Sequence, residues 1–299
     1  MVGAVALTNP VMTASGTAGH GAELSAYCDL SRLGAVVVKS LSAEPWPGNP
    51  APRLVPTAAG MLNSVGLQGP GVEAWREHEL PALRSAGAKV VASIWAFTVD
   101  GYAKAASMLA GAAIAAVEVN VSCPNVEDRR RMFAHSPSAT AEVVDAAGAA
   151  GVPRWVKLSP NVTDIAAVAG AALDAGAEAL TLINTVMGMV IDVESRAPAL
   201  GAGGGGLSGP AINPIAVRAV HDCRQAFPDA AIVGVGGVSS GADVAAMMMA
   251  GANAVQVGTA TFADPRAPVR ILRDFSRWCR RHRVTEVADL TSTALRGSP

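Results

Sequence analysis

Short apolar runs alternate regularly with helix-like stretches along this chain, and this pattern limits the folds that it can adopt. Eight runs are rich in Val, Ile, Leu and Ala and end in polar residues or glycine. They are near-continuous apolar segments, which is typical of strands buried on both faces of a parallel sheet. The eight runs are Val11–Ser15, Ala35–Ser40, Lys89–Ala96, Ala115–Ser122, Arg154–Pro160, Ala179–Thr185, Ala231–Val238 and Ala254–Thr259.

Several of the intervening stretches end in Gly-Ala, where the glycine suits the end of a helix. These glycines are Gly34, Gly87, Gly176 and Gly251. Clear helix-like stretches are Gly71–Ala86, Thr140–Ala150, Asp164–Ala175, Ile212–Ala226 and Ser240–Ala250. A helix, a glycine stop and a strand recurring eight times predict an α/β fold, the (β/α)8 TIM barrel, with its active site at the carboxyl ends of the strands. An open doubly wound sheet would need another strand order, and the sequence leaves that alternative open.

The chain has 299 residues, whereas about 250 are typical of such a barrel. We expect the surplus to lie in three loops, Ser42–Gly69, Cys123–Ser138 and Thr185–Pro210. No linker or charge run divides the sequence, so we predict one domain over residues 1–299.

Composition excludes several classes of protein. The net charge is -1 and aromatic residues make up 4%, so neither a phosphate-backbone surface nor a base-stacking platform is expected, and we predict no nucleic-acid partner. No apolar stretch reaches the roughly 20 residues of a membrane span, and the N-terminus lacks the basic region of a signal peptide. The four cysteines form no CxxC pair, which predicts a reduced, cytoplasmic protein, and no grouping has metal-ligand spacing.

Polar residues gather at the predicted carboxyl ends of the strands, where a barrel carries its chemistry. Lys39 and Lys157 end the second and fifth strands, and Asn120 and Asn184 end the fourth and sixth. A lysine at such a place meets either an anion or an electron-rich cofactor, because an unpaired buried ammonium is costly. The alternative is a lysine whose long side chain reaches solvent.

Glycines follow the last two strands, at Gly236-Gly237 and at Gly258-Thr259. In barrels this corner commonly binds a phosphate through backbone N–H groups. Tight turns would explain either pair alone, but both corners together favour a phosphate site. The dinucleotide-like pattern Gly201-x-Gly203-x-x-Gly206 has no strand leading into it, so we interpret it as a chance match.

Cys123 differs from the other cysteines because it lies in a predicted loop over the barrel mouth, beside Pro124. A thiol there could serve as an acid, a base or a nucleophile. Packing as a small apolar side chain is the alternative, and it suits Cys28, Cys223 and Cys279.

Several motifs together resemble class 1 dihydroorotate dehydrogenase, and most of all its class 1B catalytic subunit. The resemblance runs from about Asn9 to Asp264 in order and spacing, and the combination is specific. The motifs are NPVMTASG (9–16), GMLNSVGLQGPGV (60–72), NVSCPNV (120–126), VKLSPNVTDI (156–165), INTVMGM (183–189), GGLSGPAI (205–212), GVGGV (234–238) and VGTA (257–260).

The resemblance implies a (β/α)8 barrel that binds one FMN and oxidises dihydroorotate to orotate in pyrimidine biosynthesis. It assigns Cys123 as the catalytic base. FMN contacts would come from Ser15, Lys39, Ser40, Asn120, Lys157, Ile183, Gly209, Gly236, Gly237, Gly258 and Thr259. Substrate contacts would come from Lys39, Asn63, Val65, Gly66, Leu67, Asn120, Asn125, Asn184 and Thr185.

Two departures from the family pattern raise the question of a different substrate or partner. Ser93 stands where the family usually has an asparagine that contacts the flavin. The segment Glu127–Ala134 replaces a glycine-rich lid. Neither change touches Cys123, Lys39 or the asparagines.

Two alternative functions stay open from the sequence. One is an FMN enzyme that acts on another dihydropyrimidine ring, similar to dihydropyrimidine dehydrogenase. The other is a non-redox isomerase or synthase with the same phosphate corner. The resemblance also implies a separate subunit carrying FAD and a 2Fe-2S cluster, since this chain has no cysteine cluster for iron–sulfur. We further expect a homodimer or larger assembly. The sequence does not identify the electron acceptor.

Overall fold

Eight parallel strands form the centre of the molecule, and the computed structural model describes residues 1–122 and 132–295. The two strands at the ends of the sheet meet through a parallel bridge between Met12 and Ala35, so the sheet closes into a barrel. The predicted (β/α)8 barrel is confirmed, and the open doubly wound sheet is wrong. In order around the sheet the strands are β1 (Val11–Thr13), β14 (Ala254–Val257), β13 (Ala231–Val235), β8 (Ala179–Leu182), β7 (Arg154–Leu158), β6 (Ala116–Asn120), β5 (Val90–Ile94) and β2 (Val36–Val37).

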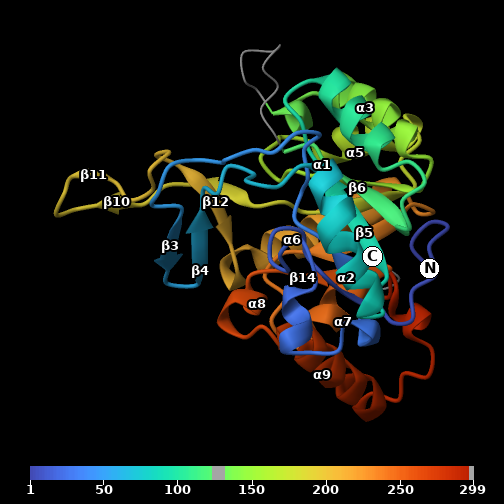
Figure 1. Ribbon diagram of the computed structural model, residues 1–299. Coiled ribbons are helices and arrows are strands. Elements are labelled where there is room, and N and C mark those ends of the chain that lie inside the picture. Colours follow the sequence, from blue (N-terminus) through green and yellow to red (C-terminus); the bar gives the residue numbers. More distant parts are fainter. Residues whose placement is uncertain (123–131, 296–299) are drawn as a thin grey trace.

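Helices surround this barrel (Figure 1), and those next to one another along the chain mostly pack side by side. Every predicted helix-like stretch contains a helix, and α3 and α9 complete the ring. A π-helical turn, Trp75–Glu79, joins α1 to α2. The helices are α1 (Val72–Ala74), α2 (Leu80–Ser85), α3 (Val99–Met108), α4 (Pro137–Ala146), α5 (Ile165–Asp174), α6 (Asn213–Ala226), α7 (Gly241–Ala250), α8 (Ala260–Ala263) and α9 (Ala267–Arg281).

Local sequence explains where several helices begin and end. A capping box starts α7, because the Ser240 side chain accepts from the Asp243 amide while the Asp243 carboxylate accepts from the Ser240 amide. Gly87, Gly176 and Gly251 have positive φ, as expected of glycines that stop helices. Gly34 does not share this conformation; an added Cβ there would collide with the carbonyl oxygen of Asn9, so close packing accounts for it.

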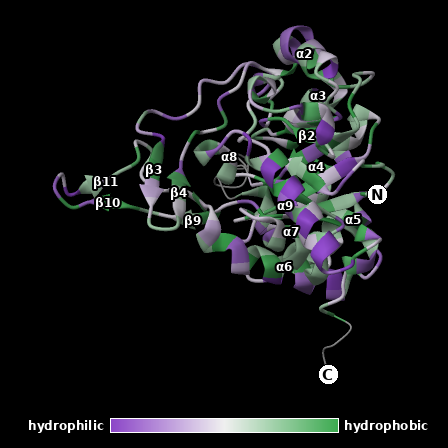
Figure 2. Cartoon of the chain, turned by 90° about the horizontal axis from the view of Figure 1, so that it is seen from below, coloured by the Kyte–Doolittle hydropathy of each residue, from purple (hydrophilic) through white to green (hydrophobic). Residues whose placement is uncertain are grey.

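A second, antiparallel sheet corrects the prediction that Ser42–Gly69 and Thr185–Pro210 are loops. Its strands are β3 (Leu54–Thr57), β4 (Gly60–Asn63), β12 (Gly205–Ser208) and β9 (Val186–Gly188), paired in that order. Between β9 and β12 the hairpin of β10 (Ile191–Asp192) and β11 (Ala197–Pro198) projects away from the barrel (Figure 1). Seen from below, the hairpin of β10 and β11 also stands apart from the helices around the barrel (Figure 2).

The amino-terminal end of the barrel is closed by apolar side chains. Val2 and Val5 bond to each other's backbone in a tight turn, and both are buried against the barrel interior. Met12, Val37 and Trp155 belong to the same cluster. A ligand therefore has access from the opposite, carboxyl-terminal end. Within residues 1–122 and 132–295, no helix combines the length and the apolar character that crossing a bilayer requires.

The seam between β1 and β2 depends on a side chain. The buried Thr13 hydroxyl accepts from the Val37 amide at 2.9 Å and is 3.2 Å from the Val37 carbonyl oxygen, to which it donates. It thereby satisfies both backbone groups of a β2 residue at the place where the barrel closes.

We predict that Thr13→Val lowers the free energy of unfolding by about 1–3 kcal/mol for each buried group left unpaired, as measured by urea denaturation. The matched control is Thr181→Val in β8, a buried threonine whose hydroxyl has no hydrogen-bond partner in the described part of the chain. The control should be neutral or stabilising. Equal effects of the two substitutions would contradict a special role for the Thr13 hydroxyl.

Candidate active site

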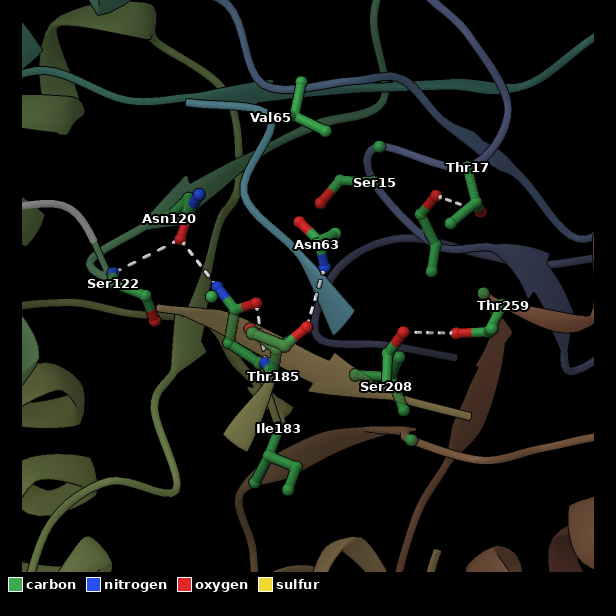
Figure 3. A pocket seen from close by; sticks show the side chains of 18 of the residues that line it. Ser15, Thr17, Asn63, Val65, Asn120, Ser122, Ile183, Thr185, Ser208 and Thr259 are labelled. Atoms are coloured by element: carbon green, nitrogen blue, oxygen red, sulfur yellow. Dashed lines mark hydrogen bonds between the residues drawn. The ribbon is translucent and has the colours of Figure 1, made fainter. Parts of the chain in front are cut away.

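One cavity of about 400 Å³ opens at the carboxyl ends of the barrel strands, and we call it the mouth cavity (Figure 3). The small antiparallel sheet supplies part of its wall through Leu54, Met187 and Gly205. The mouth cavity is lined by every described residue that the sequence analysis assigned to a cofactor or substrate site. These residues are Ser15, Lys39, Ser40, Asn63, Val65, Gly66, Leu67, Asn120, Lys157, Ile183, Asn184, Thr185, Gly209, Gly236, Gly237, Gly258 and Thr259.

The predicted base Cys123 and the predicted substrate ligand Asn125 lie outside the described residues. The residues on either side of that segment, Ser122 and Met132, both line the mouth cavity. Of the segment Glu127–Ala134, only the last three residues are described, and Ala134 donates its amide to the Val121 carbonyl at 2.9 Å.

A network of side-chain amides fixes which atoms face a ligand. The Asn120 Oδ1 atom accepts from the Ser122 amide at 3.2 Å and from Asn184 Nδ2 at 3.0 Å (Figure 3). The Asn184 Oδ1 atom accepts from the Thr185 amide at 2.9 Å. Because backbone N–H groups hold both oxygens, the orientations of the two amides are determined. The cluster is therefore arranged to offer N–H donors to carbonyl or carboxylate oxygens of a ligand.

The glycine corner has the properties of an anion site. Gly236 and Gly237 have positive φ, and a Cβ on either would lie 2.7 Å from a neighbouring side chain. Within the described residues, the amides of Gly236, Gly237, Gly258 and Thr259 donate to no protein group. Four unused amides at one corner of a cavity form a nest of partial positive charge, which suits a phosphate.

The two lysines differ in their surroundings. Lys157 is 5% exposed, and its Nζ atom lies 3.1 Å from the Ser15 hydroxyl oxygen and 3.9 Å from Glu118 Oε1. Lys39 is half-buried on the cavity wall. Both ammonium groups thus come from strand ends into one cavity, where they favour an anionic or electron-rich ligand.

Comparison with known proteins shows which family the chain belongs to. A family model described as dihydroorotate dehydrogenase matches residues 2–278. The chain belongs to the dihydroorotate dehydrogenase family. This family is flavin-dependent and its members are oxidoreductases, so the alternative of a non-redox isomerase or synthase is wrong.

Curated members of the dihydroorotate dehydrogenase family resemble this chain over nearly its whole length. The dihydroorotate dehydrogenase B (NAD(+)) catalytic subunit of Geobacter sp. (strain M21) is 46% identical over 291 residues, which cover 97% of this chain and 95% of the relative. The protein with the same name from Alkaliphilus oremlandii (strain OhILAs) is 45% identical over 290 residues, which cover 97% of this chain and 96% of the relative.

Asn161 was not predicted as a site residue, yet it forms two hydrogen bonds at the edge of the mouth cavity in this dihydroorotate dehydrogenase family member. Its Nδ2 atom donates to the Thr185 carbonyl at 3.0 Å, and its Oδ1 atom accepts from the Met187 amide at 2.9 Å. Asn161 therefore ties the end of β7 to the start of the second sheet. A signal was present, because this polar residue directly follows a predicted strand.

Ser93, the departure from the family pattern, lies behind the cavity wall. It is fully buried, and its hydroxyl lies 2.8 Å from the Ser40 hydroxyl. Ser40 in turn accepts from Asn120 Nδ2 at 3.4 Å. Ser93 thus contacts a residue of the mouth cavity instead of lining the cavity itself.

The three described cysteines are suited to packing. Burial raises the pKa of the Cys223 thiol to about 12, and it also raises the pKa values of Cys28 and Cys279. A thiol with a raised pKa forms little thiolate and is a poor base or nucleophile at neutral pH. This agrees with the interpretation of these three residues as small apolar side chains.

His20 is a second residue that the sequence did not single out. It precedes η1 (Glu23–Ala26), and its carbonyl accepts from Trp75 Nε1 at 2.7 Å. Burial, and then the positive charge of Lys39, lower the His20 pKa to about 4, while Glu23 opposes the shift. The neighbour of a cavity lysine is therefore a neutral imidazole at physiological pH.

We predict that His20 makes the fold acid-sensitive. The unfolded chain binds a proton at the ordinary histidine pKa of about 6.5, whereas the folded chain resists protonation down to about pH 4. Stability should therefore fall as pH decreases from 6.5 to 4. Urea denaturation across this range should show a shallower fall for His20→Gln. The exposed His78→Gln is the control, and identical slopes for both variants would contradict the role of His20.

Proposed function

We propose that this chain binds FMN in the mouth cavity and oxidises dihydroorotate to orotate in pyrimidine biosynthesis. The observation that carries the proposal is the convergence on one cavity of four unused amides, a buried lysine and an oriented cluster of asparagines. The curated relatives are named dihydroorotate dehydrogenases, which supports the same substrate.

The residues of the cavity fit FMN in charge and shape. The amides of Gly236, Gly237, Gly258 and Thr259 would bind its phosphate, because they point to no protein acceptor among the described residues. Lys157 would lie beside the electron-rich part of the flavin ring. Further contacts would come from Ser15, Lys39, Ser40, Asn120, Ile183 and Gly209. When bound, FMN would supply N5 as the acceptor of a hydride.

The opposite side of the cavity suits the substrate ring. Lys39 would pair with the carboxylate of dihydroorotate. The side-chain N–H groups of Asn120 and Asn184 would donate to the C=O groups of the ring, because backbone amides already hold the oxygens of these two side chains. The proposed substrate contacts are Lys39, Asn63, Val65, Gly66, Leu67, Asn120, Asn125, Asn184 and Thr185.

We assign the proton transfer to Cys123 by its resemblance to the family's base and by its place directly after Ser122, which lines the cavity. Its thiolate would take the proton from C5 of the substrate while the hydride leaves C6. Both C–H bonds break, a C5–C6 double bond forms, and two electrons leave with the hydride. A free thiol has a pKa of about 8.5, close enough to neutral pH for this task.

For the electron acceptor we propose a separate subunit with FAD and a 2Fe-2S cluster that passes electrons to NAD. The relatives' names, with "catalytic subunit" and NAD(+), support this arrangement.

We also propose a homodimer or larger assembly and a cytoplasmic location. The exposed hairpin of β10 and β11 adds an apolar surface, with Ile191 and Val193 at 51% and 76% exposure.

The proposal is tested by the absorbance spectrum of the purified chain mixed with FMN. We expect stoichiometric flavin uptake, followed by bleaching of the flavin band when dihydroorotate is added without oxygen. Dihydrouracil should leave the band unchanged, because it lacks the carboxylate that Lys39 would bind. Failure to take up FMN would contradict the proposal, and bleaching by dihydrouracil alone would favour the dihydropyrimidine dehydrogenase-like alternative.

We predict that Cys123→Ser slows flavin reduction by about 10²–10⁴-fold at neutral pH, the usual contribution of a general base. A hydroxyl is a much weaker acid than a thiol, so little of the reactive anion forms. Stopped-flow absorbance should show the wild-type rate rising with pH through one ionisation and should give normal FMN binding for the variant. Cys28→Ser is the matched control and should behave as wild type. A wild-type rate in Cys123→Ser would remove the base assignment.

A further inference from the structure

A polar trio crosses the barrel interior one layer below the mouth cavity. Gln256 Nε2 on β14 donates to Glu118 Oε2 on β6 at 2.7 Å. Because β6 and β14 are not neighbours in the sheet, this bond can only cross the interior of the barrel. Glu118 and Gln256 are fully buried and precede the cavity residues Asn120 and Gly258 by two positions each. Lys157 is the third member and lines the cavity itself.

Charge, and not a direct hydrogen bond, links Glu118 to Lys157. The distance from Glu118 Oε1 to Lys157 Nζ is 3.9 Å, which is too long for a hydrogen bond. Within the described residues, Glu118 Oε1 accepts no hydrogen bond. The Lys157 ammonium instead lies 3.1 Å from the Ser15 hydroxyl oxygen, at the cavity. The lysine therefore faces the ligand while its counter-ion stays below it.

Such an arrangement is costly for the fold. A buried carboxylate with one unsatisfied oxygen loses hydration that a single distant ammonium does not fully replace. An apolar side chain at position 118 would avoid this cost, as the side chains of Met12, Val37 and Trp155 do in the cluster at the amino-terminal end of the barrel. The charge at this position consequently needs an explanation outside folding stability.

We propose that Glu118 is a positioning residue that acts through Lys157 to set the reduction potential of the bound flavin. This inference rests on the proposed function, since it requires FMN above Lys157. Two-electron reduction by the substrate hydride adds negative charge to the flavin, and the Lys157 ammonium stabilises that charge. The Glu118 carboxylate lies on the far side of the ammonium and offsets part of this stabilisation, which lets the electrons leave for the next acceptor. In a low-dielectric interior, charges at these distances interact strongly.

The test is the midpoint potential of FMN bound to the full chain, measured spectroscopically against reference dyes. Glu118→Gln keeps the size of the side chain and an oxygen for Gln256 while removing the charge. We expect its two-electron reduction equilibrium to shift at least tenfold toward the reduced flavin, which is about 30 mV. Thr181→Val is the matched control. Thr181 lies opposite Lys157 in the register of β7 and β8, and the substitution removes a buried polar atom without removing a charge. An unchanged potential in Glu118→Gln would overturn the proposal.

A second measurement covers the case in which Glu118→Gln folds poorly. Urea denaturation of the flavin-free chain is compared for Glu118→Gln, Lys157→Gln and the double variant. If the two charges act as a pair, the double variant is more stable than the summed losses of the single variants predict. If only the double variant folds and neither single variant does, the result would support the charge pair. Strictly additive losses of stability would overturn the pair. Lack of FMN uptake by the wild-type chain would instead count against the proposed function, because this cycle needs no flavin.

Discussion

Closure of the barrel between β1 and β2 determines where the functional side chains of this protein lie. Only a closed ring of parallel strands brings all eight carboxyl ends to one rim. The ring closes through the Met12–Ala35 bridge and through the Thr13 hydroxyl, which pairs with the backbone of Val37. The valines of the N-terminal turn seal the other end. Lysines, asparagines and glycines that are far apart in the sequence therefore share one cavity.

The barrel could be predicted from the sequence because its signals are local. Each strand is a short apolar run, and each run is separated from the next by a helix with its own start and stop. The second sheet could not be predicted in the same way. Its β4 and β12 pair across more than a hundred residues, and their sequences, GMLN and GGLS, are rich in glycine and only partly apolar. Tertiary contacts determine the conformation of these two strands, whereas their composition is typical of loops.

The candidate site was predictable to the extent that its residues end strands or match family motifs. Glu118 and Gln256 escaped notice because each is one polar residue inside an otherwise apolar run, and the sequence does not show that they meet across the barrel. His20 was missed for a related reason. Its lowered pKa arises from burial and from Lys39, and neither is visible in the sequence around it.

The mouth cavity has two walls of different origin. The barrel strands supply Lys157 and the glycine corner, whereas the antiparallel sheet supplies Asn63, Met187 and Gly205. The barrel wall is held by the closed ring, while the other wall is held by its own hydrogen-bonded strands. The two walls are joined by the hydrogen bonds of Asn161 and by the 2.8 Å bond from Thr259 to Ser208. Substitutions away from these bonds can alter one wall while leaving the other in place. A lineage of such proteins can therefore vary the ligand contacts that the antiparallel sheet provides while it keeps the buried lysine and the glycine corner of the barrel wall.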